Sequence, residues 1–169
     1  MGAVTDRLAQ FGSNAVPGLI TLLLVFVGLV PLGIPQSALV VPPLALMAVY
    51  YWGIYRPDLL PGIAAFAIGL FYDVLSGGAL GFYAFIFLVV RAVMASQRRF
   101  FLGKPFLVEW WGFMLVASVA FLTGWVLASL YVGAFVKPGP LAIQALLTIT
   151  LYPVLTWFMI RLRHAISRI

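Results

Sequence analysis

The sequence contains no cysteine, and this absence narrows the chemistry that the chain can perform. Without thiols there is no disulfide framework, no thiolate-bound metal and no thiol redox reaction. Histidine is almost as scarce, because His164 is the only one. A single histidine makes neither a histidine-rich metal site nor a proton relay across a membrane. We therefore expect no metal and no cofactor.

Charged residues are also rare. Lys, Arg, Asp and Glu together make 8% of the 169 residues, whereas 64% are hydrophobic. A water-soluble fold of this size needs far more polar side chains to cover its surface, so a soluble globular protein is excluded. The net charge of +6 does not indicate nucleic-acid binding, because the basic residues stand singly or in pairs between long apolar runs. The solvent of this chain is lipid.

Motifs for catalysis are missing as well. Intramembrane proteolysis needs paired aspartates, a serine with a histidine, or a His-Glu-x-x-His metal motif within the membrane, and the sequence has none of these. It also has no phosphate-binding P-loop. A channel would need a polar stripe along a helix, which none of the apolar segments carries. We predict that the protein is not an enzyme.

What the sequence does contain is a series of apolar segments long enough to cross a membrane. A transmembrane helix takes about 20 apolar residues. Charges and Gly/Pro clusters divide the chain into such segments. The prediction is a single domain (1–169), an all-α bundle of six transmembrane helices with short loops, at residues 16–32, 38–55, 59–75, 79–94, 107–132 and 141–160. The third and fourth segments are short and only residues 76–78 separate them, so a hairpin that crosses partially is the alternative.

Lys and Arg residues indicate the orientation, because they stay preferentially on the cytoplasmic side of short loops. With both termini in the cytoplasm, nine of the ten basic residues lie inside and only Lys137 lies outside. Loop 96–106 is predicted as the longest inner connection. A cytoplasmic basic face follows from these placements, comprising Arg98, Arg99, Lys104, Arg161 and Arg163. We expect this face to contact lipid headgroups.

Several other residues are assigned to the membrane surface. Tyr50, Tyr51 and Trp52 form an aromatic cluster near a predicted interface, where such rings are enriched. Arg91 is expected to reach the headgroups by snorkelling. Glu109 is expected to be a solvated residue of an inner loop.

Small residues at helical spacing indicate where helices touch, since helices in lipid associate through close van der Waals packing. Two stripes have this spacing: Gly62, Ala65 and Gly69, and Ala120, Gly124 and Ala128. Both are candidate faces for packing within the chain or against a partner. Pro153 lies inside the last segment, where it removes a backbone donor and predicts a kinked helix.

Apart from Glu109, which stands at the very start of segment 107–132 and is assigned to the inner loop, Asp73 is the only acidic residue inside a predicted segment. A carboxylate at membrane depth is a candidate functional site, because its ionised form is costly there. At about 3.6 residues per turn Asp73 continues the stripe of Gly62 and Gly69, so its side chain is predicted to face protein. It also lies close to the outer end of its segment. A structural role at the outer hairpin and a role toward a partner or ligand both remain open.

Two stretches carry a resemblance to a known family. The run GLFYDVLSGGALGF, residues 69–82, resembles the characteristic hairpin of MreD, the family of bacterial rod shape-determining membrane proteins. The run YPVLTWFMIRLR, residues 152–163, is similar to the last helix of that family. Asp73, Gly77 and Gly81 match the hairpin, and we expect a constraint specific to the family there. The two glycines would permit the turn and a close approach of helices.

The resemblance implies a non-enzymatic scaffold of the cell-wall elongation machinery in the bacterial inner (cytoplasmic) membrane. Members of the family are associated with MreC, the MreB filament, RodA and penicillin-binding protein 2, so the expected partner is an MreC-like protein that links to the peptidoglycan synthases. The alternative is the substrate-binding membrane subunit of an energy-coupling-factor vitamin transporter, which has a similar size. That alternative predicts an outer pocket with converging polar and aromatic groups, to which Asp73, Tyr72, Tyr83 and Tyr131 would contribute.

Overall fold

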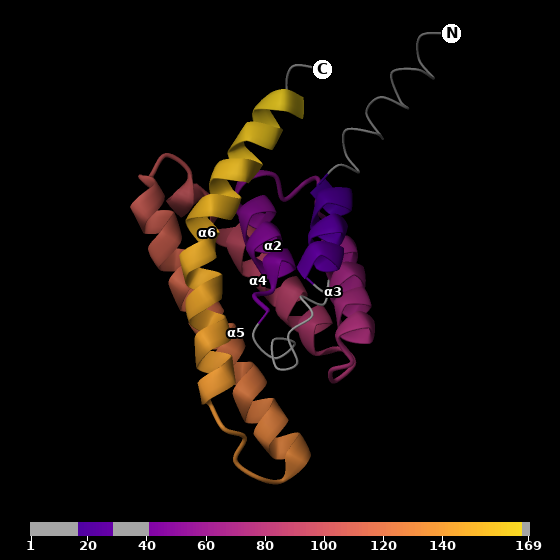
Figure 1. Cartoon of the computed structure of the whole chain (residues 1–169). Coiled ribbons are helices and arrows are strands. Elements are labelled where there is room, and N and C mark those ends of the chain that lie inside the picture. The colour runs from indigo at the N-terminus through magenta and orange to yellow at the C-terminus, as the bar shows by residue number, and fades with distance from the viewer. Residues whose placement is uncertain (1–16, 29–40, 167–169) are drawn as a thin grey trace, which may run out of the picture.

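The computed structural model describes residues 17–28 and 41–166, with side chains as far as residue 161. Within these ranges the chain forms six helices and no strand (Figure 1), which confirms the all-α prediction. The helices are Pro17–Gly28, α2 (Leu44–Tyr55), α3 (Gly62–Ser76), α4 (Phe82–Phe101), α5 (Phe106–Val132) and α6 (Gly139–Ile166).

The boundary of α4 differs most from its prediction, because the helix ends at Phe101 and not near residue 94. Arg98 and Arg99 therefore lie in its last helical turn, where positive charge is favourable at the carboxyl end of a helix. The predicted long inner loop shrinks to residues 102–105. Gly103, with a φ of 85°, and Pro105 supply the turn, and the sequence before them contains no helix breaker.

Helix length separates two candidate membrane spans from the rest. Phe106–Val132 and Gly139–Arg161 are long and apolar enough to cross a membrane. Helix α3 has 15 residues, which at about 1.5 Å per residue gives about 22 Å, against a hydrocarbon core of about 30 Å. The full count of six crossings and the cytoplasmic termini stay predictions.

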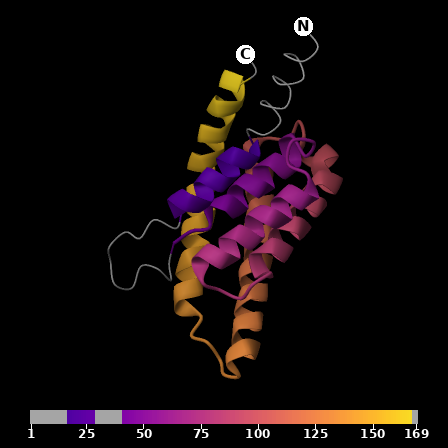
Figure 2. The ribbon, with the colours of Figure 1, turned by 90° about the vertical axis from the view of Figure 1, so that its right-hand side faces the viewer.

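The helices form two units that meet at α2. Helices α3 and α4 pack side by side as an antiparallel hairpin, and the first helix lies on α3 through an edge-to-face contact of Phe26 and Phe71, with ring centroids 5.5 Å apart. Helix α2 is central, because it packs on α4 and on α6. Helices α5 and α6 form the second hairpin, whose connecting loop reaches past the α3–α4 turn (Figures 1 and 2).

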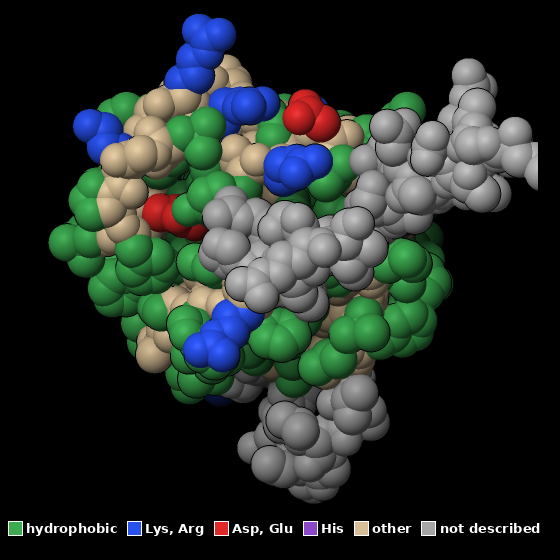
Figure 3. Space-filling view, turned by 90° about the horizontal axis from the view of Figure 1, so that it is seen from above, with side chains coloured by type: hydrophobic (Ala, Val, Ile, Leu, Met, Phe, Trp, Pro, Cys, Tyr) green, Lys and Arg blue, Asp and Glu red, His purple; other side chains and the backbone are tan. Residues whose placement is uncertain are grey.

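Basic residues of the described ranges divide between the two ends of the bundle. The α2–α3 and α4–α5 connections and the final turns of α6 lie at the same end of the bundle (Figure 1). These parts contain Arg56, Lys104 and Arg161, and the adjoining last turn of α4 contains Arg98 and Arg99. Lys and Arg side chains are visible across this end (Figure 3). Lys137 lies in the connection from α5 to α6 at the other end. Apart from Lys137, the basic residues named here thus gather at one end of the bundle, and the orientation of that end in the membrane stays a prediction.

The aromatic cluster of α2 lies inside the bundle. Tyr50 and Tyr51 are fully buried and Trp52 is 2% exposed. The physical reason is the central position of α2, which packs on α4 and on α6. The depth of this cluster in the membrane stays a prediction. These rings belong to the core.

Candidate functional site

Asp73 lies in the last turn of α3, with its carboxylate against the start of α4. The side chain is 1% exposed. Its Oδ2 atom accepts hydrogen bonds from the backbone N–H groups of Gly81 (2.9 Å) and Ala84 (3.2 Å), and Oδ1 accepts one from Tyr83 (2.9 Å). The first N–H groups of a helix have no partner within the helix, and they carry partial positive charge. Asp73 therefore caps α4 from the neighbouring helix.

Glycines shape the turn that brings Asp73 to this position. Gly77 ends α3 with a φ of 66°, and Gly81 precedes α4 with a φ of 92°. Both are left-handed conformations that favour glycine. Neither lies at a close approach of helices, because a Cβ atom added at either position would meet no atom within 4 Å. The two glycines thus serve the turn, and the expected close approach lies elsewhere.

That close approach is at the first stripe of small residues. A Cβ added to Gly69 would lie 2.5 Å from the Cα of Ala84 and 2.6 Å from the carbonyl oxygen of Tyr83. A Cβ added to Gly62 would lie 3.2 Å from the Cδ1 atom of the Leu88 side chain, also on α4. Ala65, between the two glycines, is fully buried. The Gly62, Ala65 and Gly69 stripe therefore packs against α4 within the chain.

The second stripe meets α4 through a side chain and not through its backbone. Gly124 faces the ring of Phe82. A Cβ added to Gly124 would lie 3.0 Å from the Cζ atom of that ring. Ala120, Gly124 and Ala128 instead line a cavity of about 770 Å³, which we call the groove. Its walls are the α3–α4 turn with the start of α4, and the second half of α5; Pro43, Leu46 and Leu141 complete it.

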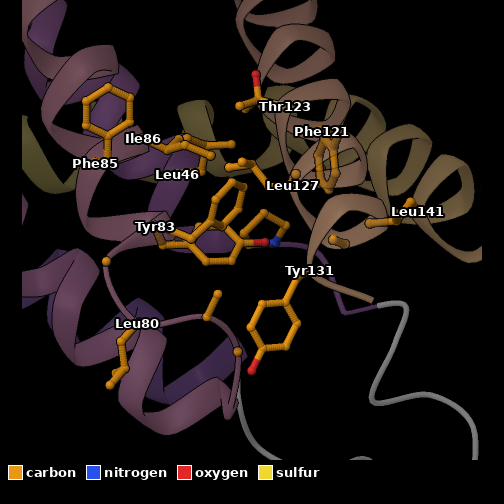
Figure 4. A pocket seen from close by; sticks show the side chains of 18 of the residues that line it. Leu46, Leu80, Tyr83, Phe85, Ile86, Phe121, Thr123, Leu127, Tyr131 and Leu141 are labelled. Atoms are coloured by element: carbon orange, nitrogen blue, oxygen red, sulfur yellow. The ribbon is translucent and has the colours of Figure 1, made fainter. Parts of the chain in front are cut away.

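Side chains of the groove are almost all apolar (Figure 4). Phe85, Ile86, Phe121 and Leu127 are among its aromatic and aliphatic lining residues, and Tyr83, Thr123 and Tyr131 supply its hydroxyl groups. No charged side chain of the described residues lines it, and the Asp73 carboxylate is instead bonded to the backbone of α4. An apolar groove of this kind suits a hydrocarbon-like surface better than a charged ligand. Of the four residues named for the vitamin-subunit alternative, Tyr83 and Tyr131 line the groove, whereas Asp73 and Tyr72 do not.

A second buried carboxylate was not expected. Glu109 lies in the first turn of α5 and is 5% exposed, so its assignment to a solvated loop is wrong. Its Oε1 and Oε2 atoms accept hydrogen bonds from the hydroxyls of Tyr152 (2.5 Å) and Tyr55 (2.8 Å). The hydroxyl of Tyr50 donates to the backbone carbonyl of Glu109 (3.0 Å). These four residues, the Glu109 cluster, join α2, α5 and α6.

Pro153 lies beside this cluster, and α6 runs through it without a break. A proline has no N–H, so the carbonyl of Ile149, four residues earlier, loses its helical partner. The indole Nε1 of Trp110 donates to that carbonyl at 3.0 Å. A side chain of α5 therefore satisfies the acceptor that Pro153 leaves in α6. The predicted kink stays a prediction.

Arg91 has protein partners. Its Nε donates to the carbonyl of Leu60 and its terminal nitrogen to the carbonyl of Pro57, each at 2.9 Å. The carbonyls of the α2–α3 connection lie within reach of the position of Arg91 on α4 and accept its hydrogen bonds. Its snorkelling to the headgroups stays a prediction. Arg91 fastens that connection to α4.

Among the predicted basic residues, two rest on aromatic rings. The guanidinium of Arg161 lies 4.4 Å from the ring centroid of Trp157, and the Lys104 ammonium lies 6.0 Å from that of Phe100. Both cations are exposed. Arg163 is within α6, but its side chain lies outside the described part. No group of three or more metal-ligating side chains occurs among the described residues.

The residues that sequence reasoning missed share one feature, namely partners that are distant in the sequence. Glu109 is separated from Tyr55 by 54 positions, and Arg91 is separated from Leu60 by 31. One signal could have located Glu109: tyrosines inside apolar segments need an acceptor, and a carboxylate at the start of an apolar run supplies one.

Comparison with known protein families gives one match. The model of the family described as rod shape-determining protein MreD matches residues 11–162. Neither the curated proteins nor the solved structures gave a match.

Proposed function

Because the chain belongs to the MreD family of rod shape-determining proteins, we propose that it is a non-enzymatic membrane scaffold of the bacterial cell-wall elongation machinery. The family is a membrane protein family, which agrees with the two helices that are long and apolar enough to cross a bilayer. In this proposal the protein resides in the inner membrane as a multi-pass protein. It binds an MreC-like partner and links it to peptidoglycan synthases such as RodA and penicillin-binding protein 2, and to the MreB filament.

The groove is the observation that carries the scaffold proposal. Helices in lipid gain little from the hydrophobic effect when they associate, so they need small residues that let backbones approach. The stripe of Ala120, Gly124 and Ala128 offers such a surface and lies open beside a cavity of about 770 Å³. An apolar partner helix placed there would fill the cavity and complete the packing of α5.

The charges around the groove also support an apolar partner. The one carboxylate near it, that of Asp73, already accepts three backbone hydrogen bonds. Its remaining role is to hold the α3–α4 turn, which forms one wall of the groove. A function of Asp73, Gly77 and Gly81 in partner binding would therefore act through the shape of this wall.

The direct test is a pull-down from a rod-shaped host in mild detergent. We expect the wild-type protein to recover wall-elongation proteins, among them the MreC-like partner, and depletion to give rounded cells. Recovery of an energy-coupling module, together with tight vitamin binding and normal rods, would contradict the proposal in favour of the transporter alternative.

Substitutions in the groove locate the binding surface. Ala128→Leu adds a branched side chain where the partner helix would approach, so we expect recovery of the MreC-like partner to fall about tenfold or more, as a loss of about 1.4 kcal/mol implies. Ala67→Leu is the matched control, because Ala67 is exposed on α3 and does not line the groove. Equal recovery with both variants would exclude the groove as the binding surface while leaving the scaffold function intact.

A further inference from the structure

The polar contacts of α5 are distributed unevenly along its 27 residues. In its first turn, Glu109 and Trp110 bond to α2 and α6. Further along, Ser118 and Thr123 donate to carbonyls of α5 itself. Trp125 and Ser129 then bond to Val136 in the loop that follows α5. The polar attachment of α5 to other helices is thus concentrated at one end.

Helix α6 is held differently. Near its start, the side-chain amide of Gln144 donates to the carbonyl of Val41 at 2.6 Å. Near its middle, Tyr152 reaches Glu109. Two separated attachments fix the direction of a helix, whereas attachment at one end leaves a helix free to tilt. We therefore expect α5, and not α6, to change its direction.

The half of α5 that has no polar side-chain bond to another helix among the described residues is also the half that lines the groove, from Ala120 to Val132. Its contact with the opposite wall includes the pair of Gly124 and the Phe82 ring, an apolar contact without directional bonds. We propose that the Glu109 cluster is an anchor that sets the tilt of α5, and that α5 is the movable wall of the groove. The width of the groove then depends on four residues at the other end of the bundle.

The Glu109 cluster is suited to this role because its bonds depend on one carboxylate. Tyr55 from α2 and Tyr152 from α6 each donate to a different oxygen of Glu109, so removal of the carboxylate breaks both links at once. The third tyrosine of the cluster, Tyr50, donates its hydroxyl to the backbone carbonyl of Glu109 and not to the carboxylate. The inference does not require that the MreC-like partner binds, because it concerns the chain alone.

The magnitude of the movement follows from helix geometry. Leu130 is 21 positions after Glu109, which at about 1.5 Å per residue is about 31 Å along the helix, so a tilt of about 10° displaces it by about 5 Å. The absence of cysteine allows spin labels to be placed at chosen pairs without background. Leu80, Leu130 and Leu146 are all exposed and lie on the α3–α4 turn, on α5 and on α6.

The experiment measures two label distances by electron–electron resonance in the purified full-length protein. In Glu109→Leu we expect the distance between labels at Leu80→Cys and Leu130→Cys to shift or broaden by about 5 Å, and the distance between Leu80→Cys and Leu146→Cys to stay unchanged. Asp58→Asn is the control, because it removes a carboxylate from an exposed connection. An unchanged first distance overturns the proposal, and so does an equal change in both distances, which would indicate general loosening.

A second variant covers the case in which Glu109→Leu does not fold. The double change Tyr55→Phe and Tyr152→Phe keeps the carboxylate but removes both donors, and the same two distances apply with the same criteria. Loss of partner binding with unchanged distances would support the scaffold function and overturn the anchor. Altered distances in a protein that never binds the MreC-like partner would support the anchor and contradict the scaffold function.

Discussion

The two hairpins of the molecule use the same sequence feature in different ways. In the α3–α4 hairpin, Gly69 lets two backbones approach until no room for a Cβ remains. In the α5–α6 hairpin, Gly124 meets only the end of the Phe82 ring, and its stripe lines the groove. The comparison teaches that small-residue spacing identifies a surface for close packing, but the neighbour decides whether the surface is already occupied.

The largest expected effect tests the occupied stripe. Gly69→Ala places a Cβ within 2.5–2.7 Å of backbone atoms of α4, which cannot rotate away. We expect a loss of about 3 kcal/mol or more in the free energy of unfolding, because the two helices must separate. Unfolding by SDS titration in mixed micelles measures this. Gly78→Ala is the control, since its Cβ would meet only the Ser76 hydroxyl at 3.5 Å; equal losses would refute close packing at Gly69.

Next in size is the cap that holds the α3–α4 turn. Asp73→Asn replaces one acceptor oxygen with an NH₂ group that would face the N–H groups of α4. We expect a loss of about 2 kcal/mol in the free energy of unfolding, as for a buried hydrogen bond to a charged group that loses its partner. The same titration applies. Asp58→Asn, in an exposed connection, should have no measurable effect. If Asp73→Asn left the free energy of unfolding unchanged but abolished binding of the MreC-like partner, a direct role of Asp73 in binding would be favoured.

A smaller effect is expected between the helices of the second hairpin. Trp110→Phe removes the donor to the Ile149 carbonyl, which Pro153 leaves without a helical partner. We expect a loss of about 1 kcal/mol in the free energy of unfolding, measured by the same SDS titration. Trp111→Phe is the matched control, because Trp111 is 62% exposed. Equal stability of the two variants would mean that the carbonyl is satisfied in another way.

The smallest effect is predicted for the open stripe. The Cβ introduced by Gly124→Ala would meet the far end of the Phe82 ring at 3.0 Å, and that ring is able to move. We expect the free energy of unfolding to change by less than about 0.5 kcal/mol, as for substitutions that create no strain. A loss as large as that of Gly69→Ala would show that α5 is packed as tightly as α3, and the contrast between the hairpins would fail.

Two buried carboxylates show where sequence reasoning succeeds and where it ends. Asp73 lies within an apolar segment on the face that carries Gly62 and Gly69, and helical periodicity was enough to predict that it faces protein. Glu109 lies only three residues into α5, at a position where a loop and a helix look alike in sequence. Its burial depends on Tyr55 and Tyr152, which only the packing of three helices brings together.

Local apolar content, helix breakers and charge were enough to predict the all-helical class, the start and end of α5 within a residue and the gathering of basic residues at one end. The family was also readable, since its hairpin is a contiguous run of residues. The tertiary structure alone decided that α2 is central, that Arg91 and Glu109 are bonded within the protein, and that one small-residue stripe is filled while the other borders a groove. These outcomes depend on contacts between residues that lie far apart in the sequence, and local patterns carry no information about which distant surface will meet them.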